Sequence, residues 1–310
     1  MNENTFSAAG GEPRCIVQAI TATALLAAKI PERSLLIAPW LPERGLAMIY
    51  APRGLGKTFL TLSIAYAIAS GGSVLSWKAT TPTPVLYVDG EMPLQALQHR
   101  LRGIIAGSDA RLIEEEDFRI LSADSTVQGI PDLGTEEGRR VIFENLGPAK
   151  VVVFDNLSTL TGVRENEADD WLPVQQFLLA LRRRGIAVIL VHHAGRNGHA
   201  RGTSRREDVL DTVISMKRPE DYEASQGARF VVEFEKARGF SGTDAAPIEA
   251  TLVTDPTSEA ITWQFGPPRD AFGRAMEMFS EGRSPKDVIA ELGVKKPTAY
   301  RWHQKFRSGE

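Results

Sequence analysis

The sequence has a single cysteine, and it lacks an apolar run long enough to cross a bilayer. Without a second cysteine, Cys15 cannot form an intramolecular disulfide, which fits the cytoplasmic location that we expect. A membrane-spanning helix needs about 20 apolar residues. The run at 16–28 is shorter and contains threonine and glutamine, so we expect a helix packed on the core rather than a signal peptide, and no membrane association.

Positive charge is not in excess either, since the formal net charge is −3 over 310 residues. This excludes a globally basic surface, so any nucleic-acid binding must depend on local patches. Internal repeats and low-complexity segments are also missing. The content of 43% hydrophobic and 24% charged residues is ordinary for a globular protein, and the length allows one large domain or a core with a small appendage.

Apolar segments alternate with amphipathic ones through most of the chain. We expect strands at 47–50, 85–89, 119–121, 151–155 and 186–192, and helices at 57–70, 94–105, 136–145 and 168–184. Strands that are continuously apolar are buried on both faces, which predicts an α/β fold with a mostly parallel sheet and helices on both faces. Four later strands lack long helices between them and predict an antiparallel extension of the sheet, at 209–216, 230–236, 250–253 and 261–265.

The composition divides the chain into three parts. Residues 1–30 form an N-terminal arm with a helix from Ile16 to Lys29, and residues 31–268 form the α/β core. The sequence Gly266-Pro267-Pro268 is the linker, because consecutive prolines cannot continue a strand ladder. Residues 269–310 are then expected to form a small all-α domain.

The central motif is a glycine-containing loop between an apolar strand and a helix. Gly56, Lys57 and Thr58 match the end of the P-loop pattern, in which backbone N–H groups surround phosphate, the lysine reaches the β/γ oxygens and the hydroxyl holds Mg²⁺. Ala51 stands where the pattern has its first glycine, which is tolerable if its φ is negative. We therefore expect ATP and Mg²⁺ as ligands of Ala51, Pro52, Arg53, Gly54, Leu55, Gly56, Lys57, Thr58 and Phe59.

Acidic residues end two of the apolar strands. Asp155 follows VVVF and is expected to hold Mg²⁺ together with Thr58, although it could instead cap the next loop. Asp89 ends the strand at 85–89, and Glu91 follows it by two residues. Hydrolysis needs a carboxylate that orients and deprotonates water, and we favour Glu91 over Asp89, with capping of the next helix as the alternative role of Glu91.

Two consecutive histidines end a further strand. A zinc site is not indicated, because neither cysteine nor a second ligand at metal-binding spacing is nearby. We expect His192 and His193 to lie at the nucleotide site, one of them as a polar sensor of the γ-phosphate, with a structural role as the alternative for the other.

Together these residues resemble the RecA-like P-loop ATPases, and among them the hexameric replicative helicases of the plasmid RepA type. The resemblance covers about 36–265 and depends on APRGLGKT at 51–58, VDGEMP at 88–93, VVVFDN at 151–156, VHHAGR at 191–196 and EKARG at 235–239. It implies that Glu91 is the catalytic base, and that His192 or His193 senses the γ-phosphate. It also implies a hexameric ring, in which Lys236 and Arg238 reach the neighbouring subunit's site.

A cation supplied from a neighbouring subunit would neutralise charge on the transferring phosphoryl group and couple assembly to hydrolysis. Without the resemblance, Lys236 and Arg238 would be read as two exposed cations on a strand. Two features depart from the family pattern, namely Ala51 and the C-terminal segment, which RepA-type helicases do not require.

Two segments carry basic residues suited to nucleic acid. The glycine-rich stretch at 194–207 is either a solvated loop or the lining of a channel for single-stranded DNA, contacted by Arg196, Arg201, Arg205 and Arg206. The tail predicts a helix-turn-helix from helices at 285–292 and 297–306, with a helix at 272–281 completing a three-helix unit. Such a unit could bind duplex DNA through Lys295, Lys296 and Arg301, or could serve as a protein-docking module.

The sequence thus leaves two functions open. The first is an ATP-driven motor on nucleic acid, most simply a replicative DNA helicase. The second is a DNA-bound ATPase switch that loads or regulates another enzyme without translocating.

Overall fold

The computed structural model describes residues 19–162, 168–195, 207–219, 222–268, 271–292, 294 and 296–308. The chain divides into two compact units, Met1–Arg33 and Ser34–Glu310. In the first unit, α1 (Ala22–Ala27) begins after Thr21, whose hydroxyl accepts the Ala24 N–H. This helix is shorter than the one expected over 16–29, and the expected packing of the helix on the core stays a prediction.

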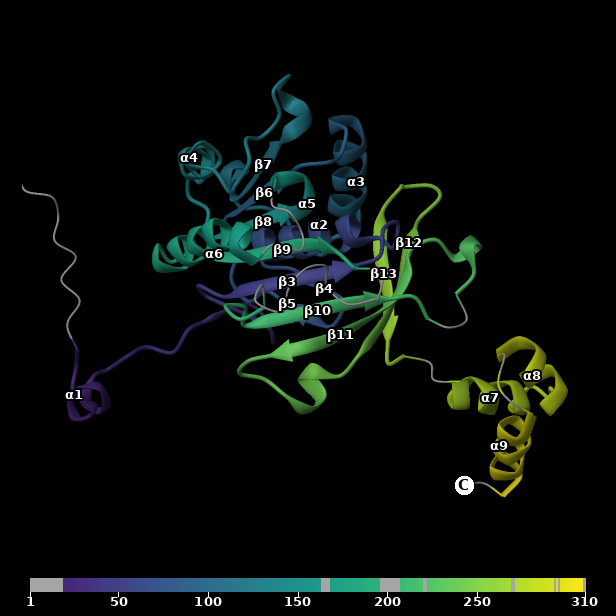
Figure 1. Ribbon diagram of the computed structural model, residues 1–310. Coiled ribbons are helices and arrows are strands. Elements are labelled where there is room, and N and C mark those ends of the chain that lie inside the picture. Colours follow the sequence, from purple (N-terminus) through teal and green to yellow (C-terminus); the bar gives the residue numbers. More distant parts are fainter. Residues whose placement is uncertain are drawn as a thin grey trace, which may run out of the picture. The chain divides into compact units, whose positions relative to one another are not determined.

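Among the described residues, nine strands form one sheet in the order β13-β12-β11-β10-β3-β9-β8-β6-β7 (Figure 1). Six strands are parallel: β3 (Leu46–Ala51), β6 (Val85–Asp89), β7 (Phe118–Ser122), β8 (Val151–Asp155), β9 (Ala187–His193) and β10 (Thr212–Lys217). Three are antiparallel to their neighbours: β11 (Arg229–Ala237), β12 (Ile248–Thr254) and β13 (Ile261–Gly266). The mostly parallel α/β fold is confirmed, with one correction. The first of the four late strands, β10, runs parallel to β3, so the antiparallel extension starts at β11.

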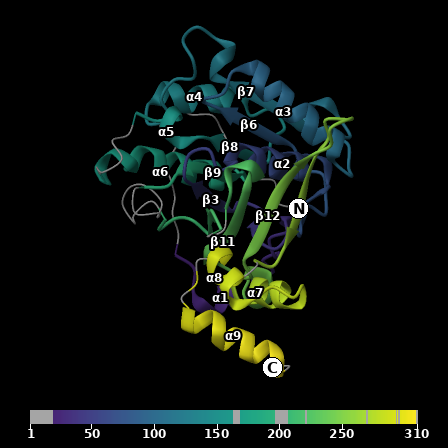
Figure 2. The same cartoon turned by 90° about the vertical axis from the view of Figure 1, so that its right-hand side faces the viewer.

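Helices cover both faces of the parallel strands. Alternate residues of β3 enter different cores: Ala47 and Ile49 pack in the core that includes α2 (Lys57–Ser70) and α3 (Leu94–Gly107), whereas Met48 packs in the other core. That second core includes residues of α4 (Glu136–Asn145), α5 (Leu157–Leu160) and α6 (Ala168–Arg183). Figure 2 shows the two helix groups on opposite sides of β6, β8 and β9. This two-sided burial explains the continuously apolar strands.

Short elements that the sequence did not predict surround this core. The strands β1 (Leu35–Ile37) and β2 (Leu41–Pro42) pair with each other, as do β4 (Ser73–Val74) and β5 (Trp77–Lys78). The Trp40 and Trp77 rings meet edge to face, with centroids 5.4 Å apart. Single-turn helices lie at Glu115–Asp117, Ala123–Ser125, Ala224–Gln226 and Gly242–Ala245. No helix in the described part of the chain is long and apolar enough to span a membrane.

Most of the described residues after 270 are helical, as expected. They form α7 (Ala271–Ser280), α8 (Pro285–Leu292) and α9 (Lys296–Ser308). The three helices share a small core of their own, built from Ala275, Met278, Phe279, Val288 and Ala299. Asp287 fixes the start of α8, because its carboxylate accepts both the N–H and the hydroxyl of Ser284. The domain boundaries and the helix-turn-helix identity remain predictions.

Candidate nucleotide site

The polar residues that end the parallel strands meet at one edge of the sheet. Asp89 of β6 pairs in register with Asp155 of β8, and Ala51 of β3 pairs with His193 of β9. These strand ends border a cavity of about 520 Å³, which is lined by Arg53, Gly54, Gly56, Lys57, Thr58, Phe59, Asp89, Glu91, Met92, Pro93, Arg100, Asp155, Asn156, His193 and Ala228. The P-loop, both strand-end acids and Glu91 therefore converge, as expected for ligands at the carboxyl edge of a parallel sheet.

Left-handed glycines shape the P-loop. Gly54 has φ of +73°, and Gly56, the residue before α2, has φ of +103°. A Cβ at Gly56 would lie 2.9 Å from the Ala228 Cβ, so both backbone conformation and space favour glycine there. Ala51 is the buried last residue of β3 and is not among the described residues with positive φ, which satisfies the condition for replacing the usual glycine.

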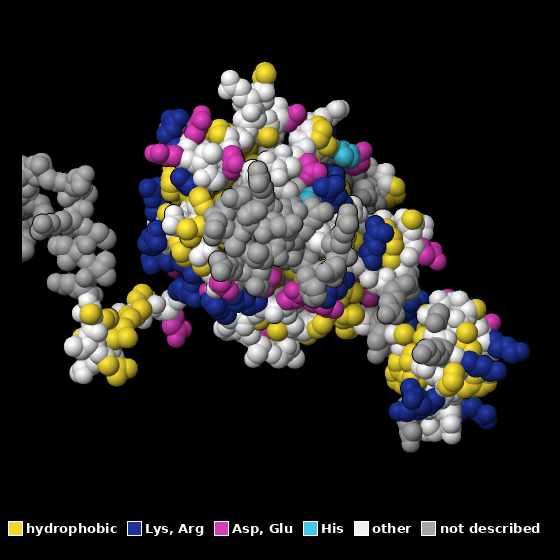
Figure 3. Space-filling model, in the orientation of Figure 1, with side chains coloured by type: hydrophobic (Ala, Val, Ile, Leu, Met, Phe, Trp, Pro, Cys, Tyr) yellow, Lys and Arg dark blue, Asp and Glu magenta, His cyan; other side chains and the backbone are white. Residues whose placement is uncertain are grey.

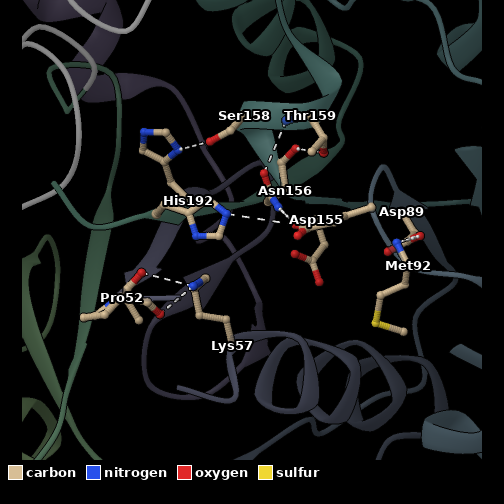
Figure 4. A network of polar contacts seen from close by, with 12 residues as sticks. Pro52, Lys57, Asp89, Met92, Asp155, Asn156, Ser158, Thr159 and His192 are labelled. Atoms are coloured by element: carbon tan, nitrogen blue, oxygen red, sulfur yellow. Dashed lines mark hydrogen bonds and ion pairs between the residues drawn. The ribbon is translucent and has the colours of Figure 1, made fainter. Parts of the chain in front are cut away.

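Lys57 is nearly buried, with 6% of its surface exposed. Its Nζ donates to the carbonyl oxygens of Ala51 (3.0 Å) and Pro52 (2.8 Å) (Figure 4). Burial lowers the pKa of Lys57 to about 8, against the opposing effect of the Asp155 and Glu91 carboxylates. Phosphate oxygens beside this ammonium would favour its charged form.

Asp155 lies at the base of the cavity and is 4% exposed. Its Oδ2 accepts the Tyr87 hydroxyl at 2.6 Å. Burial raises the pKa of Asp155, while hydrogen bonds from Tyr87 and Thr58 and the charge of Lys57 oppose that rise. A buried carboxylate next to a hydroxyl is an all-oxygen donor pair, which fits Mg²⁺. Thr58 and Asp155 are thus the residues that could hold the ion.

Glu91 and Asp89 differ in exposure and partners. The Asp89 side chain is buried, and its Oδ2 accepts the Met92 N–H at 3.0 Å; burial raises its pKa to about 6. The Glu91 side chain is 59% exposed, and its Oε2 accepts the Asn156 Nδ2–H. Both residues line the cavity, but the Asp89 carboxylate is engaged in the turn, whereas most of the Glu91 side chain is exposed.

The alternative that Glu91 caps α3 is not supported. The residue before α3 is Pro93, and no side chain caps it. The Leu94 N–H instead bonds to Asp124 Oδ2 at 2.9 Å. The Glu91 carboxylate is thus not used at the start of this helix.

Of the two histidines, the structure brings His193 to the cavity. Its Nε2 lies 4.0 Å from Glu91 Oε2. His192 points to the other face of β9, as successive strand residues do, and its Nδ1 lies 3.5 Å from the Ser158 hydroxyl (Figure 4). Of the two histidines expected near the phosphate, His193 is thus the one that lines the cavity, while the described contact of His192 is with Ser158.

Lys236 and Arg238 lie at the other end of the parallel strands, where β3 and β10 begin, and not at the end that carries the P-loop. The Arg238 N–H bonds to the Asp211 carbonyl at 3.0 Å, and the Asp211 N–H bonds to the carbonyl of Leu46, the first residue of β3, at 2.7 Å. The P-loop begins at the other end of β3, about 16 Å away at 3.3 Å per residue. The Lys236 ammonium donates to the Glu207 carbonyl. Neither cation can therefore reach the P-loop of its own chain.

The predicted nucleic-acid residues are only partly described. Arg196, Arg201, Arg205, Arg206 and Lys295 lie outside the described residues. Lys296 and Arg301 are exposed on α9, and the Lys296 Nζ lies 5.9 Å from the Tyr300 ring centroid. On the face drawn in Figure 3, Lys and Arg side chains stand out over the C-terminal helices.

The sequence reasoning missed Arg100 and Asn156. The Arg100 guanidinium lies 4.5 Å from the centroid of the Phe59 ring and lines the cavity. Arg100 follows Leu97, a buried residue of α3, by three positions and so shares its face, whereas Arg102 is exposed. That spacing, on the helix that follows the site's acids, could have identified it.

Comparisons with known proteins agree with this architecture. The solved structure of a KaiC-like protein from the hyperthermophilic archaeon Pyrococcus horikoshii OT3 superposes with a TM-score of 0.52, covering 74% of this chain and 93% of that chain. The sequence identity is 19%, so this likeness concerns the fold alone. A family model described as an AAA domain matches residues 12–199, more than half of the chain. The chain therefore belongs to this AAA domain family.

Proposed function

We propose that this protein is a ring-forming, ATP-hydrolysing motor on DNA, most simply a replicative helicase. The observation that carries the proposal is the position of Lys236 and Arg238 at the sheet edge opposite the P-loop. If these cations act on ATP, they act on the ATP of another copy.

Such a contact joins two different surfaces. One lies at the carboxyl-terminal ends of the parallel strands in one subunit, and the other lies at the amino-terminal ends of the parallel strands in the next subunit. Head-to-tail contacts of this kind form closed rings or open filaments, depending on the rotation between copies. The resemblance to RepA-type helicases supports a ring of six. Each interface would then contain one complete site.

The described residues suit in-line hydrolysis of the γ-phosphate. Thr58 and Asp155 would hold Mg²⁺, which would supply positive charge against the negative charge of the phosphates. Lys57 adds positive charge at the β/γ oxygens, and Glu91 orients and deprotonates the attacking water. Asn156 holds one oxygen of the Glu91 carboxylate, and His193 stands beside it, so a change at the γ-phosphate can be passed to β9 and the arginine-rich segment that follows.

DNA is the proposed partner at two places. Arg196, Arg201, Arg205 and Arg206 follow β9 directly, so a strand shift at His193 would move a segment suited to phosphate contacts. The exposed cations of α9, Arg301, Lys305 and Arg307, suit duplex DNA.

The three-helix unit favours a second candidate function. A motor that translocates along DNA of any sequence gains little from a domain that recognises duplex DNA. A switch that stays bound to DNA needs such a domain. The separate core of α7 to α9 and the basic surface of α9 fit an ATPase that loads or regulates another enzyme.

A strand-displacement assay with ATP and a forked DNA duplex separates the two functions. A motor should displace the labelled strand and should form hexamers in native mass spectrometry. Lys57→Ala protein is the matched control, since it should show neither ATP turnover nor displacement. ATP turnover stimulated by DNA, but without displacement, would contradict the motor and favour the switch.

A further inference from the structure

A buried chain of hydroxyl groups connects the P-loop helix with the acidic residue at the end of β8. Thr61, on α2, has its hydroxyl 3.1 Å from that of Tyr87, on β6. The Tyr87 hydroxyl lies 2.6 Å from Asp155 Oδ2. Thr61 and Tyr87 are 1% and 0% exposed, so water does not reach either group.

The direction of these hydrogen bonds follows from the number of protons. An ionised carboxylate only accepts, so the single Tyr87 proton must point to Asp155. The Tyr87 oxygen is then the acceptor in its contact with the Thr61 hydroxyl. Thr61 has a single hydroxyl proton, which it divides between Tyr87 and the Lys57 carbonyl, 3.0 Å from its Oγ1.

Packing alone does not explain the Tyr87 hydroxyl. The ring lies in the core beside Phe118, with centroids 6.5 Å apart, and a phenylalanine would fill the same space. Burying a hydroxyl costs free energy that only a well-placed partner offsets. That partner here is the carboxylate placed to hold Mg²⁺.

We propose that Tyr87 is a positioning residue, whose hydroxyl holds the Asp155 carboxylate in the orientation required for Mg²⁺ binding. The inference rests on the Mg²⁺–ATP site described above. Tyr87 donates to one carboxylate oxygen and so restricts rotation of the group, while Thr58 stands on the cavity side of Asp155. Groups that orient a metal ligand in this way change metal affinity by about 10- to 100-fold when they are removed.

The test compares nucleotide binding with and without the ion. Tyr87→Phe removes the hydroxyl and keeps the ring. With a fluorescent, non-hydrolysable ATP analogue, we expect the Mg²⁺ concentration for half-maximal binding to rise about tenfold. Affinity measured in EDTA should change less than twofold, because the phosphate contacts of the P-loop are untouched. ATPase activity should recover at high Mg²⁺, which a loss of structural integrity would not allow.

Tyr66→Phe is the matched control, since Tyr66 is another buried tyrosine, whose hydroxyl bonds to the Ala110 carbonyl and not to the site. A second variant, Thr61→Val, removes the hydroxyl next to Tyr87 and should raise the Mg²⁺ requirement by a smaller factor. This variant tests the proposal if Tyr87→Phe protein does not fold. An unchanged Mg²⁺ requirement in folded Tyr87→Phe protein, or an equal loss of affinity with and without Mg²⁺, would overturn the positioning role and leave the proposed ATPase standing. Wild-type protein that binds no nucleotide would overturn both.

Discussion

Glu91 and His193 face each other across the nucleotide cavity, with 4.0 Å between Oε2 and Nε2. They come from different strand ends, and Asn156 holds the same Glu91 oxygen. The two residues proposed as catalytic base and as γ-phosphate sensor are thus adjacent in the structure.

This arrangement predicts the effect of Glu91→Gln. The amide keeps the shape of the side chain but cannot take a proton from water, so turnover should fall by roughly two to four decades. Nucleotide affinity should stay near the wild-type value, because the P-loop is unchanged. Steady-state ATPase assays and equilibrium binding measure the two effects.

Asp89→Asn is the matched control for that experiment. The Asp89 carboxylate accepts the Met92 N–H inside the turn, and an asparagine oxygen can accept the same bond. Turnover should therefore stay within about tenfold of wild type. If Asp89→Asn abolished hydrolysis and Glu91→Gln did not, the assignment of the base would be reversed.

Nucleotide binding should take up protons at alkaline pH. Burial lowers the pKa of Lys57 to about 8, so at pH 8.5 much of the free protein carries a neutral Lys57. Phosphate favours the charged form and raises this pKa. Affinity should therefore decline as pH rises above 8. Calorimetry in buffers of different ionisation enthalpy should detect proton uptake at pH 8.5 and much less at pH 7, and equal uptake at both would contradict this role of Lys57.

Arg100 should contribute to nucleotide affinity. Its guanidinium lies over the Phe59 ring and lines the cavity, where it adds positive charge close to the P-loop. Arg100→Ala should raise the Kd for ATP about tenfold, the scale of one lost charge-assisted contact. Arg102→Ala removes an exposed arginine from the same helix and should leave the Kd unchanged. Equal effects of the two changes would point to a general loss of positive charge instead.

Local pattern was enough to predict the elements that hold the site. The runs at 85–89 and 151–155 are continuously apolar up to a final acid, and both strands have those bounds. Their pairing through Asp89 and Asp155 follows from parallel topology. The pairs β1–β2 and β4–β5 were missed because strands of two or three residues are too short to show a period.

Other features depend on tertiary contacts that the sequence does not show. The parallel direction of β10 depends on its pairing with β3, and not on its composition. The alternation of side chains along β9 predicts that His192 and His193 point to opposite faces of the sheet. Which of them lines the cavity depends on the packing around β9: His192 lies beside Ser158 of α5, and His193 lines the cavity. The hydrogen bond between Tyr87 and Asp155 joins two strands, and the sequence of each strand predicts only a buried strand of the core.

The position of Arg238 gives the strongest test of assembly. Arg238→Ala should bind ATP near normally, because each protomer keeps its own P-loop, yet it should lose about three to five decades of turnover if the guanidinium acts in the neighbouring site. Lys57→Ala protein should be inactive for the complementary reason, because its own P-loop is defective while its Arg238 is intact. Sedimentation of both variants is the control, since failed ring assembly would also abolish turnover.

Mixing the two inactive variants should then restore part of the activity. At an interface where an Arg238→Ala subunit offers its P-loop and a Lys57→Ala subunit offers its Arg238, every catalytic group is present. The fold already places Arg238 beside the first residue of β3, a strand of about 16 Å whose other end leads into the P-loop, so rescue within one subunit is not expected. Mixed rings, shown by native mass spectrometry to contain both variants, that stay as inactive as the separate proteins would refute the trans role and favour an ATPase switch that works without a shared site.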